Sequence, residues 1–269
     1  MRYWYKYLIK ETNHNNLDRF DFTDEQLIRD NNFFKERFKF DNFKKIDLFY
    51  KIYNFLGKTL KEKETLFIGS SWGWVEFFLN EKFKVTASDV RQEYVVFHKK
   101  NTKLNYKKLN ILEEALDKSF YESYSQIVVN NIEYLFDQKQ LQTCLMNLAN
   151  ISRKGGDVFF IFRSRDGFAQ SLIDNHLAYF ETKLIYYFKK LQKKNVFFTK
   201  NHQGFRRKIQ DFITLFNDFN FKHIATHKDM FETEYERLKI IDKLKISKIL
   251  SIIFFKSHPY LNIIHFKKY

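Results

Sequence analysis

The stretch that decides the fold reads Leu66-Phe-Ile-Gly-Ser-Ser-Trp-Gly-Trp-Val-Glu-Phe-Phe-Leu79 and, after a short gap, Lys84-Val-Thr-Ala-Ser-Asp89. An apolar run meets a turn of small residues, an amphipathic segment follows, and a second apolar run ends on an acid. This order predicts a strand, a tight turn, a helix and a second strand, which form a βαβ unit that binds a nucleoside. The acid follows Gly69 by 20 residues, which places it where the edge of a ribose would lie.

The turn holds two of the chain's seven glycines, Gly69 and Gly73. Glycine lets the backbone turn sharply and brings backbone N–H groups close to a ligand. The residues between them, Ser70, Ser71 and Trp72, do not give the Gly-x-Gly-x-x-Gly order of dinucleotide-binding dehydrogenases. The turn therefore favours a nucleoside site of another kind.

Further strand-like runs alternate with helical patterns along the rest of the chain. Ile127-Val128-Val129 is a β-branched run that suits a strand buried on both faces. Five further strands are expected at 108–111, 127–129, 158–162, 221–226 and 261–266, which with the two strands of the βαβ unit makes seven. The alternation predicts an α/β fold, a Rossmann-like, doubly wound and mainly parallel seven-stranded sheet.

Two regions depart from this alternation. Residues 1–60 read mainly as helix and predict an N-terminal helical segment before a main domain at 61–269. Residues from about 164 to 206 contain many aromatics and no parallel-strand pattern. They predict a helical, aromatic cap inserted over the edge of the sheet where ligands bind. A turn is expected at Lys154-Gly155-Gly156. A basic helix is expected at 235–255, where it would pack on the sheet or, alternatively, bind an anionic membrane.

In this order the residues resemble the class I S-adenosylmethionine-dependent methyltransferases, in particular the small-molecule group of methyltransferase type 11/12. The match covers roughly residues 60–163 and, more loosely, 205–269. The resemblance implies S-adenosylmethionine as cofactor, with the glycine-rich turn around its methionine end and Asp89 on both ribose hydroxyls. It places Val90 on the adenine, Asn110 near the adenine amino group, and Asn130 between cofactor and acceptor. The cofactor-binding residues that it implies are Gly69, Ser70, Ser71, Gly73, Asp89, Val90, Asn110, Ile111 and Asn130.

Several of these positions have an ordinary structural alternative. Asp89 could cap the following helix, and Asn110 could simply form a turn. The chain also departs from the family pattern, because Phe67 and Ser125 replace acids, Ser71 replaces a glycine and Asn110 replaces an aspartate. The cofactor site is therefore predicted from the whole ordered set of motifs and not from any one of them.

The acceptor side is less defined by the sequence. Methyl transfer depends mainly on the positioning of the acceptor, while a hydroxyl acceptor also needs a base. Tyr134, His176 and His202 are the candidate bases or acceptor contacts. No spacing among the eight histidines is typical of a metal site.

The net charge of +15 raises nucleic acid or an anionic membrane as partners. The lysines, however, accompany abundant Asn, Ile and Phe and scarce Gly and Pro, a composition typical of AT-rich coding. We therefore expect a small-molecule or a sugar- or lipid-linked acceptor under the cap, and no nucleic acid. An RNA methyltransferase remains an alternative, supported by Lys189, Lys190, Lys193, Lys194, Arg206 and Arg207. A catalytically inactive methyltransferase-like scaffold is a second alternative.

Cys144 is the only cysteine, so no intrachain disulfide can form. Charges interrupt the apolar runs near Met1, which does not fit a signal peptide. The longest apolar run, 249–255, is far shorter than the roughly 20 residues that span a bilayer. The expectation is a cytoplasmic protein without a transmembrane segment; the sequence leaves the acceptor and the oligomeric state open.

Overall fold

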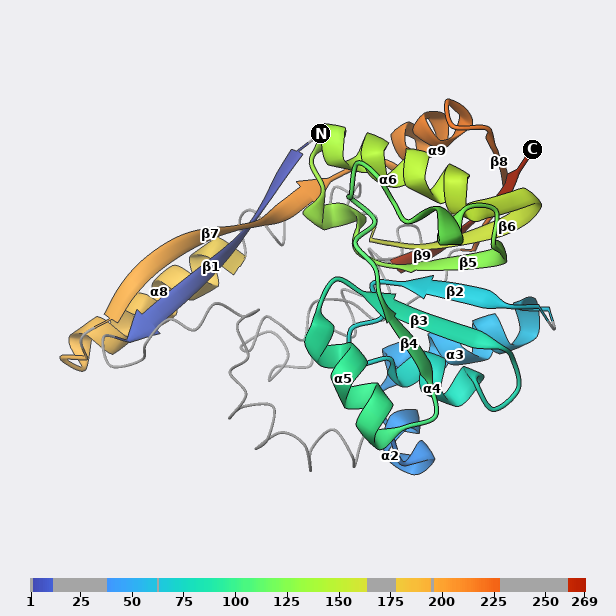
Figure 1. Cartoon of the computed structure of the whole chain (residues 1–269). Helices are drawn as coiled ribbons and strands as arrows, with labels where there is room; N and C mark the ends of the chain where they lie inside the picture. Colours follow the sequence, from blue (N-terminus) through green and yellow to red (C-terminus); the bar gives the residue numbers. More distant parts are fainter. Residues whose placement is uncertain (1, 12–37, 62, 164–177, 195, 228–260) are drawn as a thin grey trace.

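The computed structural model describes residues 2–11, 38–61, 63–163, 178–194, 196–227 and 261–269 (Figure 1). A seven-stranded sheet forms its centre, with the strand order β4-β3-β2-β5-β6-β9-β8. Its strands are β2 (Thr65–Ile68), β3 (Val85–Asp89), β4 (Asn105–Lys108), β5 (Tyr124–Asn130), β6 (Ser152–Arg163), β8 (Phe221–His227) and β9 (Leu261–Lys268). β9 runs antiparallel to both of its neighbours, β6 and β8, and the other pairings are parallel. The predicted doubly wound, mainly parallel sheet is confirmed.

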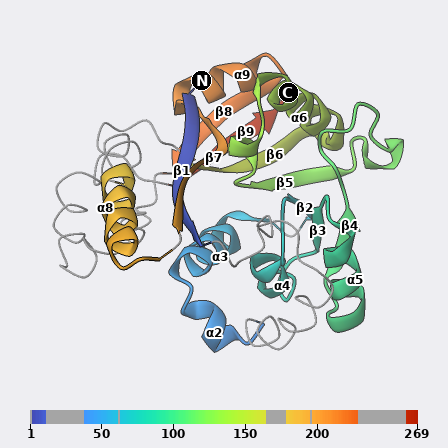
Figure 2. The ribbon, with the colours of Figure 1, turned by 90° about the vertical axis from the view of Figure 1, so that its left-hand side faces the viewer.

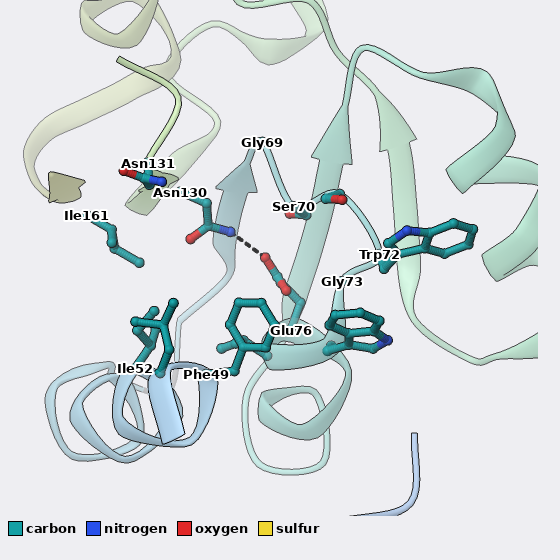
Figure 3. A pocket seen from close by; sticks show the side chains of 14 residues that line it. Phe49, Ile52, Gly69, Ser70, Trp72, Gly73, Glu76, Asn130, Asn131 and Ile161 are labelled. Atoms are coloured by element: carbon teal, nitrogen blue, oxygen red, sulfur yellow. Dashed lines mark hydrogen bonds between the residues drawn. The ribbon is translucent and has the colours of Figure 1, made fainter. Parts of the chain in front are cut away.

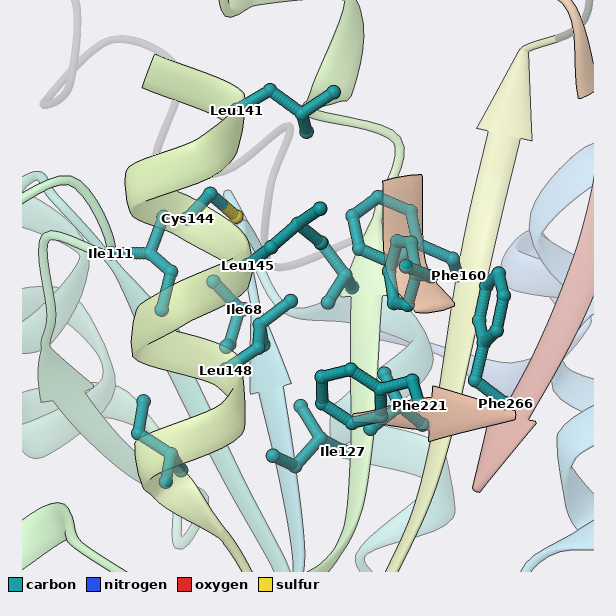
Figure 4. Packing of buried hydrophobic residues seen from close by; sticks show 14 of the residues in the cluster. Ile68, Ile111, Ile127, Leu141, Cys144, Leu145, Leu148, Phe160, Phe221 and Phe266 are labelled. Atoms are coloured by element: carbon teal, nitrogen blue, oxygen red, sulfur yellow. The ribbon is translucent and has the colours of Figure 1, made fainter. Parts of the chain in front are cut away.

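Helices cover both faces of this sheet (Figures 1 and 2). One face carries α2 (Phe40–Lys44), α3 (Asp47–Thr59), α4 (Trp74–Leu79) and α5 (Gln92–Asn101); the other carries α6 (Gln138–Ile151) and α9 (Ile209–Asn217). Because side chains alternate along a strand, Val128 joins the core on the first face, while Ile127 and Val129 join the core on the second. Figure 4 shows α6 packing on Ile68, Ile127 and Phe160. The β-branched run of β5 is therefore buried on both faces, as predicted.

Two predicted elements are displaced or embedded. The strand expected at 108–111 is β4, which ends at Lys108. The prediction was displaced because β4 buries only Tyr106 and therefore has no apolar run in the sequence. Asn110 and Ile111 therefore lie in the loop after β4. The Lys154-Gly155-Gly156 turn lies within β6: the register with β5 shifts there, and Gly155 has a φ of +72°.

The helical prediction for residues 1–60 is wrong at its beginning. β1 (Arg2–Glu11) is a strand that pairs antiparallel with β7 (Val196–Arg206), and 12–37 lie outside the described residues. Tyr3, Tyr5 and Tyr7 alternate with other residues and favour a strand, but the partner strand is far away in sequence. α2 and α3 are helical, as expected.

β1, β7 and α8 (Ala178–Leu191) form an arm that projects from the sheet (Figures 1 and 2). The aromatic rings of Tyr179 and Tyr186 in α8 pack against the ring of Phe198 in β7. At the base of the arm, Gly204 lies against the backbone of Tyr134 in η2 (Glu133–Leu135). The described residues of the predicted cap are thus α8 and β7; 164–177 and the basic segment 235–255 lie outside the described chain.

Candidate functional site

The carboxyl ends of the parallel strands meet at one edge of the sheet, and two adjoining cavities lie there. The larger cavity, which we call the nucleoside groove, has a volume of about 620 Å³. It is bounded by the turn after β2, the end of β3, the loop after β4 and the exit of β5. The second, the inner chamber, has about 290 Å³ and is bounded by α3, α4, the same turn and Ile161 (Figure 3). Gly69, Ser71, Trp72, Asn130 and Asn131 line both.

The turn after β2 requires its glycines for conformation and close packing. Gly69 has a φ of +75°, and a Cβ there would lie 2.5 Å from Cγ2 of Ile132. Gly73 has a φ of +62°, and its Cβ would lie 3.2 Å from Nε2 of His98. Ser71 also has a positive φ, +51°, a conformation that is uncommon outside glycine. The backbone of the turn therefore has three residues in the left-handed region and packs closely against the segment that follows β5.

Asp89 joins this turn to the segment after β3. One carboxylate oxygen accepts a hydrogen bond from the backbone N–H of Ser71 at 3.0 Å, and the other accepts from the N–H of Arg91 at 3.3 Å. Burial raises the pKa of Asp89 above its ordinary value. α5 begins after Arg91 without a side-chain cap, so Asp89 does not serve as its N-cap. The carboxylate has lone pairs left for further donors in the groove.

His98 supports the turn from behind, a role that the sequence did not indicate. Its ring nitrogens lie 3.1 Å from the carbonyl oxygen of Trp72 and 2.9 Å from the hydroxyl of Thr102. Burial lowers its pKa to about 4, so the ring is neutral at pH 7. The hydroxyl of Tyr106, whose ring stacks on His98, donates to the carbonyl oxygen of Ser71 at 2.6 Å. α5 and β4 thus fix the backbone of the turn.

The other predicted cofactor residues divide between the two cavities. Val90, Asn110 and Ile111 line the nucleoside groove, and the side chain of Val90 is 52% exposed. Asn110 also forms the turn considered as its alternative role, because its Oδ1 accepts from the N–H of Leu112 at 3.1 Å. Ser70 and Gly73 line the inner chamber and do not line the groove.

Glu76, which the sequence analysis missed, lies in the wall of the inner chamber. It comes from α4 and is only 2% exposed. Its Oε1 accepts a hydrogen bond from Nδ2 of Asn130 at 2.6 Å (Figure 3). Burial raises its pKa from 4.5 to about 7. An acid within the apolar run Trp74–Leu79 was the signal that could have identified it.

Asn131, the next residue along the β5 exit, is in an unusual state. It has a φ of +47°, and its Oδ1 is buried without a hydrogen-bond partner among the described residues. Strained backbone and unsatisfied polar atoms destabilise a fold and persist only where the surrounding structure holds them. Such features concentrate at functional sites. Asn131 lines both cavities, so it faces any ligand that bridges them.

The structure does not assemble the three candidate bases into one set. Tyr134 lines the nucleoside groove. His202 pairs with Tyr5 in the ladder between β1 and β7, and His176 lies outside the described residues. In the described chain, no residue of α8 or β7 is among those that line either cavity, and the predicted cap over the acceptor stays a prediction.

Two kinds of feature are absent from the described part of the chain. It holds no group of three His, Cys, Asp or Glu residues that could bind a metal ion. It also contains no helix with the length and hydrophobicity of a membrane span.

No family model and no curated protein matches this chain. Solved structures do match it. A SAM-dependent methyltransferase from Methanosarcina mazei is 14% identical with a TM-score of 0.52, over 80% of this chain and 96% of that one. A SAM-dependent methyltransferase from Archaeoglobus fulgidus is 13% identical with a TM-score of 0.51, over 82% and 94%. A Pyrococcus horikoshii OT3 protein is 10% identical with a TM-score of 0.54, over 86% and 93%. The chain has the class I SAM-dependent methyltransferase fold.

Proposed function

We propose that this protein is an S-adenosylmethionine-dependent methyltransferase that acts on a small molecule or a sugar- or lipid-linked intermediate. The observation that carries the proposal is the position of Asp89. Its carboxylate lies at the end of β3 and is bound to the turn after β2, inside a groove of about 620 Å³. That volume is within the range of small-ligand pockets.

The residues of the groove fit the parts of this cofactor. The free lone pairs of Asp89 can accept the two ribose hydroxyls. The exposed side chain of Val90 offers an apolar surface for the adenine, and Asn110 lies beside it. The turn from Gly69 to Gly73 borders both cavities, and the methionine end of the cofactor would lie along it, where the two cavities meet. When bound, the cofactor supplies a methyl group on a positively charged sulfur.

The protein's own contribution is to position the acceptor and exclude water. Phe49, Ile52 and Ile161 give the inner chamber apolar walls (Figure 3). Because the chamber opens beside residues shared with the groove, an acceptor there would lie next to the cofactor. Its volume of about 290 Å³ favours a small reacting group. Effective alignment of two reactants is the main source of acceleration for such a displacement.

Calorimetry with S-adenosylmethionine and S-adenosylhomocysteine tests the proposal. Each hydrogen bond to a charged group contributes about 1.5–3 kcal/mol, so Asp89→Ala, which loses two, should weaken binding at least about a hundredfold. Asp41→Ala is the matched control, because Asp41 is exposed and its ion-pair partner among the described residues is Lys44 in the same helix, α2. Unchanged affinity in Asp89→Ala, or equal binding of NAD by the wild type, would contradict the assignment.

A further inference from the structure

We propose that the inner chamber binds the protic group of the acceptor, and that Glu76 takes its proton while Asn130 holds the Glu76 carboxylate in place. The acceptor that fits is a small, mainly apolar, uncharged molecule with one phenol-like O–H or one N–H group. This inference rests on the proposed function, because it assigns the second substrate to the same site.

The chemistry of the chamber wall selects this class of molecule. Most of the lining is apolar, contributed by Leu48, Phe49, Ile52, Trp74, Val75 and Ile161. The polar part is small and includes the carboxylate of Glu76 beside the side chains of Ser70 and Asn130. Among the described residues, no lysine or arginine lines the chamber. The wall therefore favours hydrogen-bond donors and disfavours phosphate or carboxylate groups.

Glu76 is placed to act on such a donor. Burial of a carboxylate without an ionic partner is unfavourable, and an apolar side chain would fill the same position at lower cost. Asn130 donates to Oε1, and Ser70 and the backbone of Glu76 also interact with this carboxylate, whose roughly four lone-pair directions leave it about one further acceptor position. Asp89 is the charged group that faces it, and this like charge also raises the pKa of Glu76. A carboxylate whose pKa is about 7 is well matched to take a proton at neutral pH.

Asn130 also links Glu76 to the nucleoside groove, since it lines both cavities. A protic group bound to Glu76 would therefore lie beside the wall that the two cavities share. In the reaction, the acceptor's oxygen or nitrogen forms a bond to the methyl carbon as the carbon–sulfur bond breaks and its electron pair stays on sulfur. The acceptor's proton passes to the Glu76 carboxylate, which becomes the neutral acid and later releases the proton to solvent.

Phenol and anisole are suitable probes, because they differ only in that a methyl group in anisole replaces the O–H hydrogen that Glu76 would accept. Their affinities can be compared by ligand-observed NMR titration, with and without saturating S-adenosylhomocysteine. We expect the wild type to prefer phenol. The ionised fraction of a group with a pKa of about 7 rises about tenfold from pH 6 to pH 8, so the preference should rise by up to about tenfold.

Glu76→Gln should reduce the preference for phenol and make it independent of pH, because the glutamine side chain does not ionise. Glu64→Gln is the matched control, since Glu64 pairs with Lys84 away from both cavities and should keep the wild-type preference. A merely structural role for Glu76 would not produce the pH dependence.

Three results separate the possible failures. A phenol preference that is unchanged in Glu76→Gln would overturn the inference. Weaker binding of S-adenosylhomocysteine in Glu76→Gln, with the phenol preference intact, would also overturn it, because Glu76 would then hold the cofactor's ammonium group. If the wild type binds neither form of the cofactor, the proposed function fails, and the titrations without cofactor still test Glu76.

Discussion

Replacing Glu76 by glutamine should make the protein more stable at alkaline pH. Burial raises the pKa of this carboxyl from 4.5 to about 7. A carboxyl whose pKa is higher in the folded state than in the unfolded state makes its full contribution to stability below the unfolded pKa of 4.5. That contribution is lost as the pH rises through the folded pKa of about 7. Each pKa unit corresponds to about 1.4 kcal/mol, so ionised Glu76 destabilises the folded state by up to about 3 kcal/mol at pH 8. Glutamine has nearly the same shape and avoids this penalty.

Urea unfolding of both proteins between pH 4.5 and 8 measures the difference. The free energy of unfolding of Glu76→Gln should be close to that of the wild type at pH 4.5 and exceed it increasingly above pH 6. Titrating groups that do not interact with Glu76, His98 included, contribute equally to both proteins and cancel in the difference, whereas Asp89 is coupled to Glu76 by charge repulsion. Glu64→Gln should show no such trend. A difference that does not change with pH, or a Glu76→Gln protein that is less stable than the wild type at pH 8, would refute the reasoning.

Two further predictions concern the support of the turn after β2. Burial lowers the pKa of His98 from 6.5 in the unfolded state to about 4 in the folded state. Between pH 6.5 and 4 the imidazole is therefore more protonated in the unfolded state, so the free energy of unfolding should fall as the pH falls through this range. His98→Gln should remove that part of the pH dependence in urea unfolding, and an equally steep slope in the variant would contradict the role. Gly69→Ala should destabilise the protein by roughly 1–3 kcal/mol, because the methyl group would meet Ile132 and φ is positive. Gly155→Ala, also at positive φ but in open space, is the control; an equal loss of melting temperature in both variants would show that the contact with Ile132 is unimportant.

The sequence predicted the parts of the fold whose signals are local. β2, β3 and β5 are short apolar runs that end at turns, so their order and their edge of the sheet could be inferred. β4 lies at the edge of the sheet and buries one residue, which left its position three residues from the expected one. β1 was missed because a strand outside the main sheet depends on a partner that local patterns do not reveal.

The candidate site follows the same division. The position of Asp89 at the end of β3, in the nucleoside groove, could be predicted because it follows Gly69 by 20 residues in the sequence. Glu76 and His98 could not, since their burial results from α3, β4 and the exit of β5 packing around them. In a helix pattern each resembles an ordinary polar residue that faces solvent. Only the three-dimensional contacts show that one faces a chamber and the other supports a turn.

The pairing of β1 with β7 has a consequence for how the chain is made. Arg2–Glu11 leaves the ribosome long before Val196–Arg206, and between them lie the five parallel strands β2 to β6. The aromatic β1 therefore has no β7 partner until then, and an unpaired strand edge favours wrong pairing. Gly204 of β7 packs on Tyr134, a residue that lines the nucleoside groove, so the late pairing bears on one wall of the groove. A failure of this pairing should thus affect the mouth of the site before it affects the seven-stranded sheet.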